Sequence, residues 1–157
     1  MKLLAIDPSH HQPAYCLIED GFVVDYGKIL LHPIVNWYEK SKRVDYVAIE
    51  SQYLGVNVRS LMTLSFCAGE LAGVAKLAGA EVILISPKQW QAKMLKISPK
   101  LRRPHIKSLS KKVASALVKY QINDPDIADA ILIAHYAFNK IRRKINEANS
   151  YDKQNAK

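Results

Sequence analysis

The 157 residues of this chain are enough for one compact domain with a single core, and we expect that domain over residues 1–148 with a frayed tail over 149–157. The 23 lysine and arginine residues outnumber the 14 aspartate and glutamate residues and give a net charge of +9, which favours a polyanionic partner, nucleic acid before an anionic membrane surface. No apolar stretch approaches the roughly 20 residues of a transmembrane helix, which argues against a membrane protein and predicts a soluble, cytoplasmic one.

Five strands and five helices are predicted from the hydrophobic pattern and the turn signals. The strands are expected at 2–7, 14–19, 22–31, 44–50 and 81–86, and the helices at 34–43, 58–77, 87–96, 104–120 and from 125 onward. The dipeptide Asp20-Gly21 favours a tight hairpin between the second and third strands, so the chain opens as an antiparallel meander. Asn123 or Asp124 can cap the last helix, with Pro125 just inside its start.

The order of these elements predicts an α/β fold. Three antiparallel strands come first, and the later strands alternate with helices, which argues for a mixed sheet in which parallel strands follow the antiparallel ones. The apolar centre of the fourth strand is typical of a strand buried on both faces, so helices are expected on both sides of the sheet. This order is similar to that of the ribonuclease-H-like fold.

Two carboxylates stand at the carboxyl ends of apolar strands. Asp7 follows LLAI, and Glu50 follows VAI. If the two strands are parallel neighbours, both side chains meet at the edge where open α/β sheets place their sites. For either residue taken alone, the alternative that it merely marks where a strand reaches water stays open.

Asp126 and Asp129 lie three residues apart near the start of the last helix and therefore share one of its faces. This helix is apolar almost all round, so burying Asp129 without a positive neighbour would be costly. Asp124 and Asp126 could instead simply favour the positive end of the helix, an explanation that suits Asp124 but not Asp129. Four carboxylates without a thiolate set suit Mg²⁺ or Mn²⁺, and two such ions would support phosphodiester hydrolysis.

The sequence resembles the RuvC family of Holliday-junction resolvases in four ordered segments: LAIDPS, VAIESQY, AGELAGVA and DPDIADAILIA. The last of these matches the D-x-x-D-A pattern of the family, with Ile131 where leucine is usual. Ser9 and Ser51 depart from the glycine and glutamine usual at these positions. The resemblance implies a RuvC-like nuclease domain with two Mg²⁺ or Mn²⁺ ions and no small-molecule cofactor. Its catalytic and metal-binding residues would be Asp7, Glu50, Asp126 and Asp129.

The resemblance also implies a homodimer, which the 61–79 region would help to form, that binds four-way DNA junctions and nicks two opposing strands symmetrically. Tyr53 takes an aromatic position of the family and is expected to stack on a base, with a packed core tyrosine as the alternative. Basic residues near the site predict a phosphate-positioning patch, although a solvated loop explains the loop charges too. The predicted patch consists of Lys88, Lys93, Lys100, Arg102, Arg103 and Lys107.

Smaller features leave alternatives open. His10 and His11 follow Asp7 closely and either approach a scissile phosphate or lie exposed in the turn. Cys16 and Cys67 lie in apolar runs without metal-ligand spacing, which indicates reduced core residues. The prediction is a structure-selective endodeoxyribonuclease. The alternatives are a broader branched-DNA or flap nuclease, and a junction-binding protein without catalysis, against which the four acids argue because they repel phosphate unless metal neutralises them.

Overall fold

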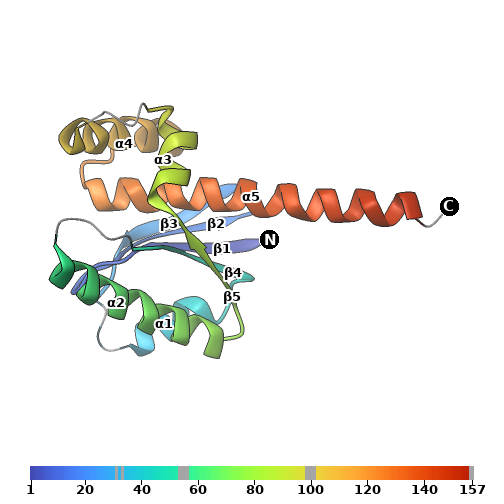
Figure 1. The fold of residues 1–157 in the computed structure, drawn as a ribbon, viewed down its shortest axis with the longest axis horizontal. Coiled ribbons are helices and arrows are strands. Elements are labelled where there is room, and N and C mark those ends of the chain that lie inside the picture. The colour runs from blue at the N-terminus through green and yellow to red at the C-terminus, as the bar shows by residue number, and fades with distance from the viewer. Residues whose placement is uncertain (31, 33, 53–56, 98–101, 156–157) are drawn as a thin grey trace.

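The structure is a computed structural model that describes residues 1–155 apart from 31, 33, 53–56 and 98–101. Within this part of the chain, five strands form one mixed sheet in the order β3-β2-β1-β4-β5 (Figure 1). Its strands are β1 (Lys2–Asp7), β2 (Ala14–Glu19), β3 (Phe22–Lys28), β4 (Tyr46–Glu50) and β5 (Glu81–Ile85). β1 to β3 pair antiparallel, whereas β1, β4 and β5 are parallel, so the predicted mixed α/β sheet is confirmed.

Helices cover both faces of the sheet (Figure 1). They are α1 (Val35–Ser41), α2 (Val58–Leu77), α3 (Pro87–Leu95), α4 (Arg103–Val118) and α5 (Pro125–Asn155). α1 and α2 lie on one face, and α5 lies on the other, with α3 and α4 packed against it. Each face therefore has its own apolar core, which explains why β1 and β4 read as continuous apolar runs.

The alternation of side chains along β1 divides its residues between the two cores. Leu3 and Ala5 belong to the core beneath α5, whereas Leu4 and Ile6 belong to the core beneath α2. All four side chains are at most 1% exposed. The same alternation assigns the polar residue at the end of each strand to one face, which decides where the candidate site lies.

The last helix is longer than the sequence predicted. α5 continues to Asn155, so residues 149–155 are helical, and the expected fraying of the 149–157 tail stays a prediction. The physical reason for the long helix is that neither glycine nor proline follows Pro125, so nothing in the sequence ends the helix. The proposed domain boundary at 148 stays a prediction. No helix in the described part of the chain is both long and apolar enough to span a bilayer.

The hairpin between β2 and β3 depends on a glycine. Gly21 has a φ of +97°, where a side chain strains the backbone, whereas Gly27 in β3 has an ordinary φ and room for a methyl group. Gly21→Ala should therefore lower the free energy of unfolding by about 1–2 kcal/mol. Gly27→Ala is the matched control and should change it by less than about 0.5 kcal/mol. Urea denaturation measures both, and equal effects would contradict the assignment of strain to Gly21.

Candidate active site

Asp7 and Glu50 stand side by side at the carboxyl edge of the sheet. Ile6 pairs with Ile49 in the parallel ladder, so the next residue of each strand is one of these two acids. Asp7 lies two residues beyond Ala5, and Glu50 lies two residues beyond Ala48, on the α5 face of the sheet. The strand register therefore brings the two carboxylates to the same edge of the sheet, as the sequence predicted for parallel neighbours.

The start of α5 adds two further acids at the same edge. α5 begins over the carboxyl end of β1 and runs back toward the amino end of that strand (Figure 1). Asp124 caps the helix, because its Oδ1 accepts the amide N–H of Asp126 at 2.8 Å and that of Ile127 at 3.2 Å. This cap fixes the first turn of α5, which carries Asp126, and Asp129 lies on the next turn.

The acids raise one another's pKa values. Burial raises the pKa of Asp7 well above its usual range, and the charges of Glu50 and Asp129 raise it further. Burial also raises the pKa of Glu50 to about 7, although the indole N–H of Trp90 donates to Glu50 Oε1 at 2.7 Å. The pKa of Asp129 is raised to about 6, chiefly by burial. The charge of Asp129 on α5 thus raises the pKa values of both strand carboxylates, Asp7 and Glu50.

Three cations lie beside these acids. Lys107 Nζ is 3.2 Å from one oxygen of Asp126, and Lys28 Nζ is 3.0 Å from the other. Lys28 Nζ also lies 2.9 Å from Asp124 Oδ2. The third cation, Arg103, is near enough to oppose the raised pKa values of Glu50 and Asp129. The positive neighbour that the sequence demanded for Asp129 is thus present, because Lys107 also lowers the pKa of that residue.

The donor chemistry of the acids fits a divalent cation. The donors are carboxylate oxygens, which Mg²⁺ and Mn²⁺ prefer. Asp129 Oδ1 is buried and has no hydrogen bond of good geometry among the described residues, although the nearby Ser110 hydroxyl lowers the pKa of Asp129. The spacing of the acids is looser than a formed ligand shell, since no three Asp, Glu, His or Cys side chains in the described residues converge closely enough to hold an ion. Both oxygens of Asp126 are engaged by lysines, Oδ2 by Lys28 and Oδ1 by Lys107.

The predicted DNA-binding residues fall into three groups. Lys107 of α4 contacts Asp126, and the charge of the exposed Arg103 lowers the pKa values of Glu50 and Asp129. Lys88 and Lys93 of α3 and Arg102 before α4 are exposed, and none has an ion pair in the described part of the structure. Two more predicted residues, Tyr53 and Lys100, lie outside the described residues.

The sequence did not single out Lys28 or the role of Trp90. Lys28 ends β3 and meets Asp126 across 98 positions of sequence, so no local pattern could have paired them. Trp90 was read as a core residue, which its 0% exposure confirms, but its indole N–H also fixes Glu50. A buried tryptophan N–H usually finds a partner, which was the available signal, although that of Trp37 has none among the described residues.

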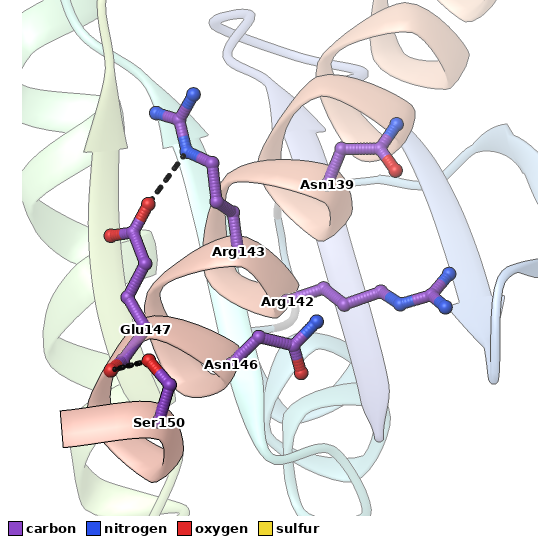
Figure 2. Close-up of a pocket in the computed structure, with 6 residues that line it drawn as sticks. All are labelled: Asn139, Arg142, Arg143, Asn146, Glu147 and Ser150. Carbon is purple, nitrogen blue, oxygen red and sulfur yellow. Dashed lines mark hydrogen bonds and ion pairs between the residues drawn. The ribbon is translucent and has the colours of Figure 1, made fainter. Parts of the chain in front are cut away.

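A hollow on the surface of α5 lies away from these acids. Figure 2 shows it along the outer part of α5, lined by Asn139, Arg142, Arg143, Asn146, Glu147 and Ser150. One helix supplies every lining residue, and Arg143 Nε is 3.6 Å from Glu147 Oε1 within it. Asn139 lies ten residues beyond Asp129, roughly 15 Å along the helix. The hollow takes no part in the candidate site.

Comparison with known proteins gives a structural likeness only. No known family profile matches the sequence, and no curated protein sequence matches it significantly. The RuvC structure from Thermus thermophilus superposes with a TM-score of 0.69 at 14% identity, over 92% of this chain and 97% of that one. The structure of T. thermophilus RuvC in complex with Holliday junction substrate superposes with a TM-score of 0.70 at 15% identity, over 91% of this chain and 96% of that one. The chain therefore has a RuvC-like, ribonuclease-H-like fold.

The buried acids should make the metal-free protein less stable at high pH. Folding raises the pKa of Asp129 from 3.8 to about 6. The favourable contribution of Asp129 to the free energy of unfolding is therefore complete below pH 3.8 and is lost as the pH rises through 6. Asp129→Asn should raise the free energy of unfolding at pH 8 by up to about 3 kcal/mol and change little at pH 4. Thermal unfolding in EDTA measures this, and added Mg²⁺ should stabilise wild type more than the variant.

Asp124→Asn is the control, because folding lowers the pKa of Asp124 and the stability of this variant should change in the opposite direction. Burial opposes the shift, but the Lys28 ammonium and the amides of Ile127 and Asp126 hold the pKa of Asp124 below its usual value. The stabilising contribution of the ionised Asp124 is therefore present above pH 3.8 and is lost as the pH falls. Asp124→Asn removes this contribution, so the variant should be less stable than wild type at pH 8. Equal responses of the two variants to pH would contradict the electrostatic account of the site.

Proposed function

We propose that this protein is a metal-dependent endodeoxyribonuclease that acts in the cytoplasm and resolves four-way DNA junctions by paired, symmetric nicks. The observation that carries the proposal is the meeting of buried carboxylates from β1, β4 and α5 at one edge of a protein whose net charge is +9. Buried carboxylates lose their hydration and repel one another, so gathering them at one edge is costly unless a divalent cation joins them there. The RuvC-like fold supports the same reading, and one structural neighbour was solved with a Holliday junction substrate.

The residues would divide the work as follows. Asp7, Glu50, Asp126 and Asp129 would hold two Mg²⁺ or Mn²⁺ ions, which supply an activated water and stabilise the leaving oxygen. The Trp90 N–H holds one oxygen of Glu50, so the other remains available as a ligand. Arg103 and Lys107 would bind the phosphate beside the acids and offset its charge during cleavage. The remaining basic side chains of α3 and the start of α4 would position the flanking backbone.

The outer face of α2 supports the proposed homodimer. Phe66 is 71% exposed and Leu77 is 79% exposed, and Val58 and Met62 continue the apolar stripe toward the start of the helix. Exposed apolar stripes of this kind mark protein interfaces. A side chain added at the neighbouring Gly69 would meet nothing within 4 Å, so a partner helix could approach the backbone closely. Two active sites in one dimer would account for paired nicks.

The nuclease proposal predicts cleavage that depends on the acids and on metal. Wild type with Mg²⁺ or Mn²⁺ should nick a labelled immobile four-way junction at symmetric positions, while EDTA, Asp7→Asn or Asp129→Asn should reduce the rate at least 100-fold. Asp20→Asn is the control, since this exposed residue lies in the distant hairpin and asparagine tolerates its φ of 50°. Gel analysis beside matched duplex, flap and single-stranded DNA measures the rates. Equal cutting of flaps would replace the proposal by a broader nuclease, and junction binding without cutting would refute catalysis.

The dimer proposal predicts that charge on the α2 face separates the protomers. Phe66→Asp should convert the dimer to a monomer, because a desolvated carboxylate has no partner in an apolar interface. Tyr120→Asp is the control, as Tyr120 is 70% exposed but follows α4. Light scattering after size exclusion measures the mass. A monomeric wild type, or loss of the dimer only in the control, would refute this interface.

A further inference from the structure

A second polar pocket lies on the α2 side of the sheet edge. It has a volume of about 400 Å³ and is formed by the turn after β1 and the first turns of α2. Its lining residues are Ser9, His10, Arg59, Ser60, Thr63 and Leu64. The turn is tied to the helix, because His10 Nδ1 lies 3.9 Å from the sulfur of Cys67. The sequence had left open whether His10 approaches a scissile phosphate or lies exposed in the turn.

The lining of the pocket suits an anion. It contains one guanidinium, one imidazole and three hydroxyls, and no carboxylate. Thr63 is already committed, since its hydroxyl donates to the backbone oxygen of Arg59 at 3.1 Å. Across the described residues, no ion pair or side-chain hydrogen bond engages the Arg59 guanidinium or the hydroxyls of Ser9 and Ser60. These donors match the oxygens of a phosphate, which a guanidinium can bind in bidentate fashion.

The end of α2 does not by itself need a ligand. The side chain of Asn57 accepts the amide N–H of Ser60 at 3.2 Å and so caps the helix. The case for a ligand rests on the hollow and on the side chains around it.

The pocket is also close to the carboxylates. Ser9 follows Asp7 by two residues, so their Cα atoms are at most about 7 Å apart. The alternation of β1 directs Asp7 to the α5 face, whereas the pocket opens beside α2. A strand of nucleic acid whose phosphate lies at the carboxylates therefore has another phosphate within reach of the pocket.

We infer that this pocket binds a non-scissile phosphate of the nucleic-acid strand held at the carboxylate edge. The inference rests on the proposed nuclease function and adds a second point of attachment, with Arg59 as its main ligand and Ser9, His10 and Ser60 as further donors. Two attachment points on opposite faces of the sheet edge would fix the direction of the strand across it. The ligand is one backbone phosphate, so the contact carries no base preference.

Binding in EDTA tests the pocket without relying on cleavage. The affinity of wild type, Arg59→Gln and Arg59→Lys for a four-way junction is measured by fluorescence anisotropy across a series of salt concentrations. Arg59→Gln should weaken binding about tenfold and reduce the slope of log affinity against log salt by about 0.7–0.9, while Arg59→Lys should keep the slope. Arg43→Gln is the matched control, because Arg43 is exposed in the turn before β4, at the opposite edge of the sheet. Unchanged thermal unfolding verifies that the variants fold.

A scan with single neutral methylphosphonates locates the phosphate. In wild type, one substitution outside the scissile position should weaken binding about tenfold, and Arg59→Gln should be insensitive to that same substitution. Equal effects of Arg59→Gln and Arg43→Gln, or no phosphate that depends on Arg59, would overturn the inference. A nuclease that cuts junctions but shows no such phosphate would leave the proposed function standing.

Free inorganic phosphate is the alternative ligand for the donors of this pocket. Inorganic phosphate is titrated against the labelled protein, and the amide resonances of Arg59 and Ser60 are followed by NMR. Shifts that saturate at millimolar phosphate, together with unchanged DNA binding by Arg59→Gln, would assign the pocket to a small anion and overturn its role in nucleic-acid binding. Shifts that the junction DNA suppresses would support it.

Discussion

The close packing of α5 on the centre of the sheet is the constraint on which the site depends. Small side chains belong to the core between them: Ala130 and Ala134, which share one face of the helix, and Ala5 and Ala48 of the strands are all 0% exposed. Because these alanines keep the side-chain layer thin, the helix backbone can approach the strands closely. The first turns of α5 thereby come down beside the ends of β1 and β4. Without that approach the acids of the helix and those of the strands would not share one site.

This packing brings together charges that destabilise the fold. Burial and mutual repulsion raise the pKa values of Asp7, Glu50 and Asp129, which means that their ionised forms are disfavoured in the metal-free protein. Lys28 and Lys107 offset part of this cost at Asp126. They are weaker than a divalent cation and bind through single ammonium groups, so they stabilise the first turn of α5 without satisfying Asp129. Strain of this kind, concentrated in one place, is typical of functional sites.

The sequence predicted the fold and the acids because both follow from local patterns. The ends of two apolar strands singled out Asp7 and Glu50, and their meeting was expected only if the strands were parallel neighbours, as β1 and β4 are. Lys28 escaped prediction, because its contact with Asp126 depends on how β3 and α5 cross in space. The pocket beside α2 escaped for a similar reason. Its residues belong to two segments about 50 positions apart, and only the path of the turn after β1 joins them.

The distribution of cations around the acids then bears on how a strand of nucleic acid would lie. Arg103 and Lys107 approach the carboxylates from α4, on the α5 side of the sheet. Arg59 stands on the other side, at the start of α2. A phosphate backbone bound by both groups would cross the carboxyl edge of the sheet, since the two groups lie beside that edge on opposite faces. Such a crossing would present a single phosphate to the acids at a time, and the protein would select that phosphate by geometry because neither contact reads a base.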